Sequence, residues 1–205
     1  MGRRGRQDTE ALKRQILDEA VALIGARGRR GTTIQDVARA VGISKQALMY
    51  HYPSKHSLVA ACGAHLANDL GPLLPRLLLA ISQPDRLEAV LDELVRYFEG
   101  RPDHARFLLR DLMDAELETV EDMAGQPFRA WVSVAVDYIR REQAAGTMPK
   151  ELDPEAAISQ VGCFLLLTFA LPTRPGGIAG EVGAEAWRAR LVAEAVRILL
   201  AAFRP

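Results

Sequence analysis

Apolar residues recur every three or four positions along most of this chain, which is the period of an amphipathic helix. No stretch shows the apolar–polar alternation of a strand, and clusters of proline and glycine interrupt the helical pattern. The pattern predicts an all-α protein of about nine helices. Their expected ranges are about 8–27, 33–42, 44–52, 54–70, 85–99, 103–118, 127–145, 153–171 and 184–203.

Residues 32–58 carry, in order, the signals of two short helices joined by a tight turn. Thr33 is suited to cap the first helix, because its hydroxyl can accept a hydrogen bond from a free N–H of the first turn. Gly42 can take the positive φ of a C-terminal cap, Ile43 returns to the core, and Ser44 caps the second helix. This order predicts a helix-turn-helix, the layout that places one helix in a DNA groove.

The second short helix has an outward face that is unusual for a solvated surface. With Leu48 directed inward, Gln46 and Tyr50 point the opposite way at about 100° per residue. The outward positions are uncharged at the centre and cationic at the edges: Lys45, Gln46, Ala47, Met49, Tyr50 and His51. The uncharged side chains suit base edges and thymine methyl groups, and the cationic ones suit phosphates, so the face predicts contact with double-stranded DNA.

The helix that follows begins with positive charge. Pro53 ends the preceding helix, Ser54 is suited to cap the next, and Lys55 and His56 fall in its first turn. The helix dipole disfavours a cation there by about 0.3–1 kcal/mol. A phosphate bound by the helix N–H groups and Lys55 would offset that cost. An exposed lysine tolerated at a small cost is the alternative.

Residues 16–58 resemble the DNA-binding domain of the tetracycline-repressor (TetR/AcrR) family of bacterial regulators. The matching residues are Gly28, Thr32-Thr33, Val37-Ala38, Gly42-Ile43-Ser44, Ala47-Leu48, His51-Tyr52, Pro53, Ser54-Lys55 and Leu58. The resemblance implies DNA contact by Thr33, Gln35, Lys45, Gln46, Ala47, Tyr50, His51 and Lys55. Met49 is counted with this face but stands where the family usually has a tyrosine that hydrogen-bonds a phosphate. Tyr50 is the candidate replacement for that contact.

The charge distribution supports a division at residue 57. Residues 1–57 hold 11 Lys+Arg against 5 Asp+Glu, a net charge of +6, and residues 58–205 hold 15 against 21, a net charge of −6. We therefore expect a DNA-binding domain over 1–57 and an effector-binding and dimerisation domain over 58–205. Arg3, Arg4 and Arg6 are expected in a tail that is disordered when free. This tail either reaches DNA or stays solvated.

The last two predicted helices are candidates for a dimer interface. The helix over 153–171 is apolar around most of its circumference, so it must be buried on all sides. The helix over 184–203 carries an apolar stripe that includes Trp187, Leu191 and Ile198. Both features and the resemblance point to a homodimer through these helices, in a four-helix arrangement. Packing within one subunit is the alternative.

Large apolar side chains in the middle helices are candidates to bind a small apolar effector, and ordinary core residues are the alternative. They are Phe98, Phe107, Met113, Met123, Phe128, Trp131 and Phe164. On the helix over 103–118 the polar residues share one face, opposite an apolar face that includes Leu112. The polar residues are His104, Asp111, Asp114 and Glu118. This face is typical of a solvated acidic surface, with a strip for a hard metal ion as the other interpretation.

Other classes of protein lack their signals here. Cys62 and Cys163 have no metal-ligand spacing and fit small buried hydrophobic residues. No glycine-rich phosphate loop and no Glu-x-x-His pair is present, so we expect neither a cofactor nor an enzyme. No signal peptide or membrane-spanning run is found, which predicts a cytoplasmic protein.

The combined prediction is a repressor that binds a palindromic operator as a dimer and is released by a small apolar effector. In that interpretation the helix over 54–70 is the one covalent rod joining the two halves. An activator of the same fold is an alternative. A helical adaptor that binds a protein partner and contacts nucleic acid nonspecifically is another.

Overall fold

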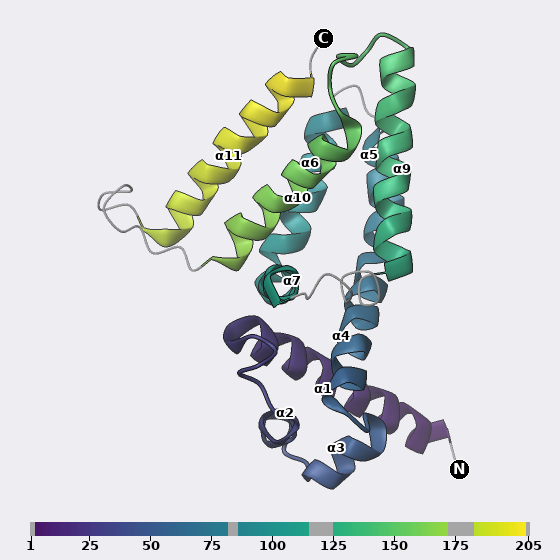
Figure 1. Cartoon of the computed structure of the whole chain (residues 1–205), viewed down its shortest axis with the longest axis vertical. Coiled ribbons are helices and arrows are strands. Elements are labelled where there is room, and N and C mark those ends of the chain that lie inside the picture. The colour runs from purple at the N-terminus through teal and green to yellow at the C-terminus, as the bar shows by residue number, and fades with distance from the viewer. Residues whose placement is uncertain (1–2, 82–85, 115–124, 172–182, 204–205) are drawn as a thin grey trace. The chain divides into compact units, whose positions relative to one another are not determined.

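A computed structural model of the chain describes residues 3–81, 86–114, 125–171 and 183–203 (Figure 1). Within these ranges the chain forms ten helices and no strand, which confirms the all-α fold class. The helices are α1 (Arg3–Arg27), α2 (Ile34–Val41), α3 (Lys45–His51), α4 (Lys55–Leu70), α5 (Leu73–Ile81), α6 (Arg86–Glu99), α7 (Pro102–Asp114), α9 (Gly125–Ala144), α10 (Pro154–Ala170) and α11 (Ala184–Phe203).

Two helical segments differ from the sequence-based expectation. Helix α5 was not predicted, because Gly71, Pro72 and Pro75 belong to the proline and glycine clusters that interrupt the helical pattern, yet Pro75 is the third residue of α5. A proline in the first turn costs little, since the N–H that it lacks has no partner within the helix. Helix α1 begins at Arg3, so the backbone around Arg4 and Arg6 is helical and the expectation of a disordered tail from residue 3 onward is wrong.

The chain folds as two compact units. Unit 1 contains Met1–Leu70 and the described part of Arg106–Gly125, and unit 2 contains Gly71–Ala105 and Gln126–Pro205. Helix α4 therefore groups with the helix-turn-helix. The chain passes from one unit to the other within α7 as well as after α4, so α4 is not the only covalent connection between them.

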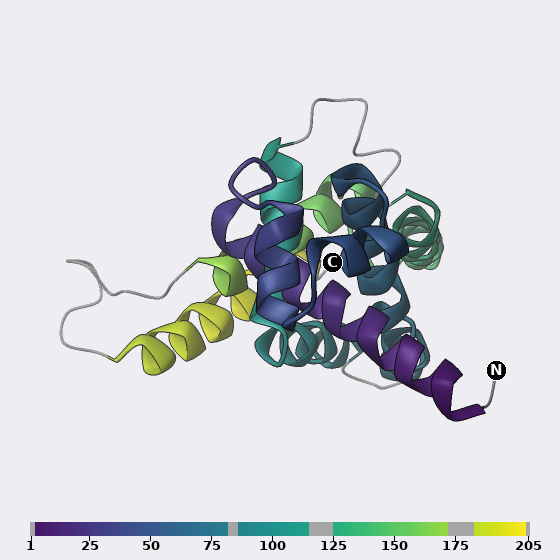
Figure 2. The same cartoon turned by 90° about the horizontal axis from the view of Figure 1, so that it is seen from below.

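The core of unit 1 is built around α1. Helix α1 packs against α2 and α4, and α2 packs against α3 (Figure 2). The fully or almost fully buried side chains come from five helices: Ile16, Ala20, Val21, Ile24, Val37, Ala38, Leu48, Leu58, Val59, Cys62, Leu66 and Phe107. Each large one contributes about 1.5–3 kcal/mol by leaving water. Burial also raises the pKa of the Cys62 thiol to about 12, so this cysteine stays protonated and behaves as a small apolar residue.

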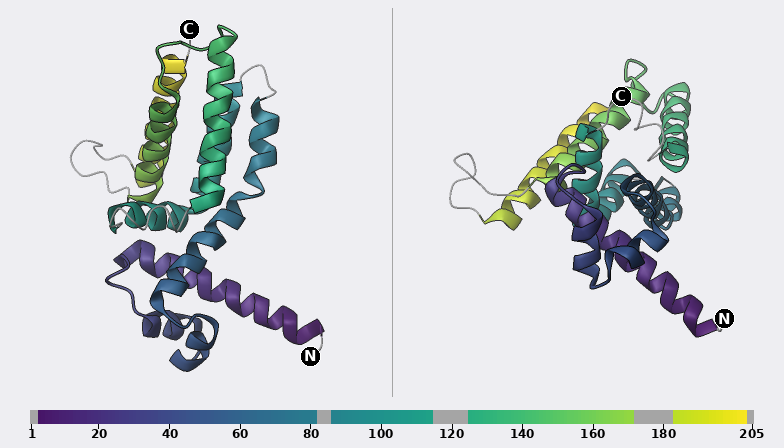
Figure 3. Two further views of the ribbon diagram at one scale, coloured as in Figure 1. Left: turned by 45° about the vertical axis from the view of Figure 1, so that its right-hand side comes forward. Right: turned by 60° about the horizontal axis from the view of Figure 1, so that its bottom comes forward.

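Unit 2 is a set of packed helices in which α6 contacts α10 and α11, and α10 lies beside α11 (Figure 3). The rings of Phe98 on α6 and Phe169 on α10 stack with their centroids 6.3 Å apart. A second apolar cluster joins Ile139 of α9, Met148 and Phe203 of α11. Because Ile139 lies in the C-terminal half of α9 and Met148 lies in the segment after it, this cluster packs both against the end of α11.

The polar face expected on α7 is not a solvated acidic surface. His104 and Asp111 are buried, with 9% and 8% of their surface exposed, whereas Leu112 on the opposite face is 52% exposed. The expectation was wrong because the helix buries the face that carries Phe107, and His104 and Asp111 lie on that side. Asp114 has no described side chain, and Glu118 lies outside the described residues. No cluster of metal-binding side chains occurs in the part of the chain that the structure describes.

None of the described helices combines the length and apolar character needed to cross a membrane.

Candidate nucleic-acid interface

A reciprocal capping box begins α2, which confirms Thr33 as its cap. The Asp36 backbone N–H donates to Thr33 Oγ1 at 3.1 Å, and the Asp36 carboxylate accepts from the Thr33 N–H at 2.9 Å and from its hydroxyl at 2.6 Å. These hydrogen bonds lower the pKa of the Asp36 carboxyl, and the bond from the Thr33 side chain has the largest effect. Both donors of Thr33 are thus engaged within the protein, and a phosphate would have to compete with the cap for them.

The turn between α2 and α3 has the geometry that its residues predicted. Gly42 has a φ of 80°, and its N–H donates to the carbonyl groups of Ala38 and Arg39. The N–H of Ile43 donates to the Ala38 carbonyl at 2.9 Å, and Ser44 Oγ accepts from the Ala47 N–H at 3.1 Å. The left-handed conformation that glycine adopts at little cost allows α3 to begin only a few residues after α2 ends.

Helix α3 buries one side chain and exposes the opposite face. Leu48 is completely buried in the core of unit 1, and Tyr50 is 85% exposed. Lys45, Gln46, Ala47 and Met49 are exposed along α3, as is Gln35 on α2. His51 is half-buried, and its ring contacts that of Tyr50 edge-on at 5.3 Å. A short helix with one anchor and an open, largely uncharged face is able to enter a DNA groove.

The cations of unit 1 fall into two groups, which the sequence alone did not distinguish. The Arg14 guanidinium lies 3.4 Å from Asp69, Lys13 lies 3.0 Å from Glu10, and Arg29 pairs with Asp111. By contrast, neither Lys45 nor Lys55 forms an ion pair with any carboxylate of the described residues. These two lysines therefore keep their charge available for phosphates.

The N-terminus of α4 is capped as the sequence predicted. The Ser57 N–H donates to Ser54 Oγ at 3.0 Å, and the Ser54 N–H donates to Ser57 Oγ at 3.1 Å. No acidic residue occupies the first turn, where Lys55 is half-buried. The positive end of the helix dipole and the Lys55 ammonium thus lie in the same turn, an arrangement that suits an anion.

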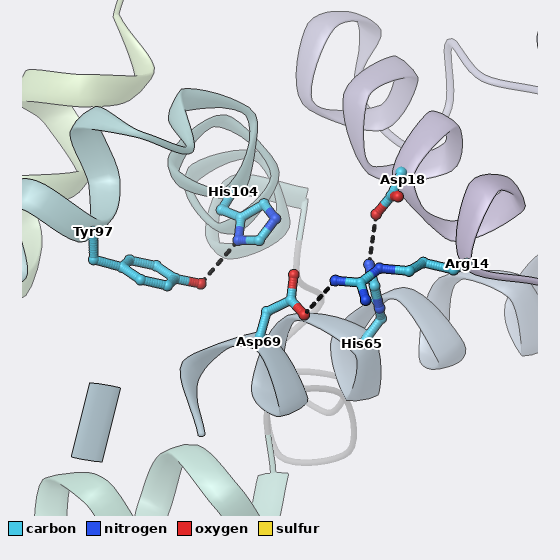
Figure 4. A network of polar contacts seen from close by, with 6 residues as sticks. All are labelled: Arg14, Asp18, His65, Asp69, Tyr97 and His104. Atoms are coloured by element: carbon cyan, nitrogen blue, oxygen red, sulfur yellow. Dashed lines mark hydrogen bonds and ion pairs between the residues drawn. The ribbon is translucent and has the colours of Figure 1, made fainter. Parts of the chain in front are cut away.

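A hydrogen bond and an ion pair, neither of which was predicted from the sequence, join α1 to α4 (Figure 4). His65 Nε2 lies 2.7 Å from Asp18 Oδ1, and Arg14 bonds to Asp69. Each helix contributes residues four apart, which therefore share one face of that helix. This spacing is the only signal in the sequence, and it does not say which helices meet. The pairs hold α4 on α1 and hence beside the helix-turn-helix.

The residues proposed to bind an effector are not brought together as one set. Phe98 stacks on Phe169 in unit 2, whereas Phe107 is buried in the core of unit 1. Met113 is 70% exposed, and Phe164 on α10 is half-buried. The side chains of Phe128 and Trp131, and the whole of Met123, lie outside the described residues.

The outer faces of α10 and α11 expose large apolar side chains in the single chain. Leu167 and Leu171 are 46% and 52% exposed, and Leu191 and Ile198 are 36% and 57% exposed. Cys163 is also exposed on α10, so the expectation of a buried cysteine holds for Cys62 only. Both cysteines are free thiols.

Three capped helices that present one short helix with an open, largely uncharged face, and lysines that pair with no described carboxylate, define a helix-turn-helix DNA-binding domain. Residues 16–62 match the model of the bacterial regulatory proteins of the tetR family. Residues 16–62 thus form a DNA-binding domain of the tetR family type, as the resemblance of residues 16–58 indicated, and the match to the family model is confined to this part of the chain.

Comparison with known proteins extends the likeness in two ways. IcaR of Staphylococcus aureus (strain Newman), described as an HTH-type negative transcriptional regulator of a biofilm operon, is 39% identical over 61 residues. These are 28% of this chain and 33% of IcaR, so the chain spans about a third of the length of this relative.

Two solved structures resemble the chain over almost all of its length. The ketosteroid transcriptional regulator KstR2 of Mycobacterium tuberculosis has a TM-score of 0.65 at 19% identity, covering 94% of this chain and 95% of KstR2. AibR, solved with isovaleryl coenzyme A and operator DNA, has a TM-score of 0.68 at 19% identity, covering 89% of this chain and 97% of AibR. At this level of identity the likeness shows the fold.

Proposed function

We propose that this protein represses transcription by binding a specific operator sequence in double-stranded DNA. The exposed face of α3 is the observation that carries the proposal. Gln46 and Tyr50 offer hydrogen-bonding groups to base edges, and Lys45 and Lys55 offer phosphates a charge that no described carboxylate pairs with. Repression is favoured because IcaR, which is similar over this head, is a negative regulator.

The protein acts as a homodimer on a palindromic site. One α3 helix reads too few base pairs to single out an operator, whereas two copies about 34–36 Å apart read two half-sites. The exposed Leu167 and Leu171 of α10, with Leu191 and Ile198 of α11, supply an apolar surface for the second copy. Helices α10 and α11 of the two copies then form a four-helix interface.

An apolar small molecule held in unit 2 lowers the affinity for the operator without separating the dimer. Two observations support this. Helices α6, α9 and α10 carry most of the candidate apolar residues. AibR, which has the same fold, was solved with isovaleryl coenzyme A and operator DNA. By linkage, effector and operator must weaken each other's binding by the same factor. In this proposal the protein binds and releases operator and effector in the cytoplasm, and it catalyses no reaction.

Selection of duplexes from a random-sequence pool by the purified protein tests the proposal. We expect a palindromic consensus, a complex of two protein chains per site, and a reporter gene that is repressed when the site overlaps its promoter. A reporter that is stimulated would establish the activator alternative. Retention of DNA without any consensus would establish the helical adaptor.

The effector part of the proposal has its own measurement. A series of straight-chain fatty acids and their coenzyme A thioesters is titrated into the complex while DNA release and protein mass are followed together. Release with the protein mass unchanged is expected. Release that tracks the appearance of monomers would contradict the proposed mechanism.

A further inference from the structure

Arg29 and Asp111 form an ion pair within unit 1, although 82 positions separate them in the sequence. Arg29 lies in the turn between α1 and α2, and Asp111 lies on α7. Their side chains are only 19% and 11% exposed. A pair so shielded differs from the exposed pairs of this head, because removing one partner leaves a charge that water cannot fully solvate.

The turn that carries Arg29 is held firmly and leads directly into the DNA-binding helices. Gly28 has a φ of 75°, and its N–H donates to the Ile24 carbonyl at 2.7 Å, which ends α1. The buried Thr32 hydroxyl donates to the Gly28 carbonyl at 3.0 Å. Thr33, the next residue, caps α2. A displacement of Arg29 therefore shifts the start of α2. Because α2 packs on α3, it also shifts α3.

Helix α7 is anchored at both of its ends on one face. Phe107 is 1% exposed in the core of unit 1 and lies one helical turn before Asp111. His104 lies on the same face three residues earlier, and its Nδ1 is 2.9 Å from the hydroxyl of Tyr97 within unit 2 (Figure 4). On the buried face of α7, His104 near the N-terminal end contacts Tyr97 of unit 2, and Asp111 near the C-terminal end pairs with Arg29 in the α1–α2 turn.

We propose that Arg29 and Asp111 are positioning residues for DNA recognition. Through this pair α7 holds the α1–α2 turn, and hence α2 and α3, in the orientation that fits a specific site. The inference rests on the DNA-binding function proposed above. It gives Arg29 a role different from the phosphate contacts proposed for Lys45 and Lys55, and it makes α7 a second covalent connection through which unit 2 influences the DNA-binding helices.

The variant Asp111→Ala separates this proposal from simple electrostatics, because the two predict opposite signs. Removing a carboxylate and releasing Arg29 makes the head more positive, so electrostatics alone predicts tighter binding to every DNA and a steeper salt dependence. A positioning role predicts that affinity for the selected duplex falls by about tenfold while affinity for random-sequence DNA does not fall. Both affinities are measured by fluorescence anisotropy over a range of salt concentrations.

Glu10→Ala is the matched control. It also removes one negative charge from unit 1, but Glu10 is exposed and pairs only one turn away with Lys13 at 3.0 Å. We expect it to leave the preference for the selected duplex unchanged. If Asp111→Ala behaves as Glu10→Ala does, or binds the selected duplex more tightly than the wild type, the positioning role is overturned.

A double-mutant cycle identifies the partner. Arg29→Ala should cost about as much specific affinity as Asp111→Ala, and the double variant should cost no more than either alone, because the contact is lost only once. Additive losses would mean that the two residues act separately and would contradict the proposal.

The cycle needs folded protein, so each variant is first compared with the wild type by circular dichroism and thermal unfolding. Should Asp111→Ala fail to fold, Asp111→Asn keeps the size of the side chain and serves in its place, with the same expected loss of specific affinity. A wild-type protein that selects no DNA would instead refute the proposed function, and that result is distinguishable from a loss confined to the variants.

Discussion

His65 Nε2 of α4 lies 2.7 Å from the carboxylate of Asp18 on α1, so the first helix of the head and the helix after the DNA-binding helices are joined directly. The second pair, Arg14 with Asp69, lies one turn away along both helices. Together they make α4 part of unit 1, and the end of α4 at Leu70 is where the chain leaves that unit.

The Asp18–His65 contact should stabilise the fold modestly. Asp18→Ala removes one partner of a hydrogen bond whose carboxylate is 56% exposed, so we expect a loss of about 0.5–1.5 kcal/mol in the free energy of unfolding. For a chain of this size that corresponds to a fall of roughly 2–5 °C in Tm. Chemical denaturation of Asp18→Ala beside Glu10→Ala measures it, and equal stabilities would show that the contact contributes nothing.

Base recognition should be confined to the exposed face of α3. Gln46→Ala and Tyr50→Ala each remove a group able to contact a base edge, so each should cost about 1–3 kcal/mol on the selected duplex and little on random DNA. Gln15→Ala, an exposed glutamine on α1, is the control. Equal losses on both DNAs would instead make these residues backbone contacts.

Lys55 should contribute charge rather than specificity. Because no described carboxylate neutralises it, Lys55→Ala should weaken binding to all sequences and reduce the slope of log K against log salt by about one unit per half-site. Lys150→Ala, an exposed lysine of unit 2, should leave the slope unchanged. An unaltered slope for Lys55→Ala would indicate that Lys55 binds no phosphate and is only tolerated in the first turn of α4.

Met49 offers a gain-of-affinity test. Met49 is 39% exposed on α3, at the position where the family resemblance implies a tyrosine that binds a phosphate. Met49→Tyr should strengthen binding to every sequence by about 0.5–1.5 kcal/mol through one added hydrogen bond. Met49→Phe supplies the ring without the hydroxyl, so the difference between the two variants isolates that bond. No difference between them would indicate that the phosphate is out of reach.

The Thr33–Asp36 capping box should give the head an acid-sensitive contribution. The hydrogen bonds from Thr33 hold the pKa of the folded Asp36 carboxyl below its ordinary value of 3.8. A depressed folded pKa means stability that is fully present above the unfolded pKa and is lost as the pH falls through the folded value. Wild type should therefore exceed Asp36→Asn in Tm at neutral pH, and the difference should shrink as the pH falls below 3.8. A difference that persists unchanged into acid would exclude this origin.

The sequence by itself determined the local structure of the head. Thr33, Gly42 and Ser44 act through their own backbone neighbours, so their caps and the positive φ follow from residue type and order alone. The outward face of α3 follows in the same way, because burying Leu48 leaves Tyr50 on the other side of a helix. The described helices from residue 86 onward were also predictable from their period, whereas α5 was not.

Only the tertiary structure decided which helices meet and which charges are free. Asp111 and His104 look like a solvated face in the sequence, and they are buried because Phe107 beside them enters the core of unit 1. Arg29 and Lys55 are equivalent in a count of charges, yet one is neutralised by Asp111 across 82 positions and the other has no such partner among the described carboxylates. A helical period specifies that a face is buried, but the identity of its partner depends on packing between distant segments, which no local pattern records.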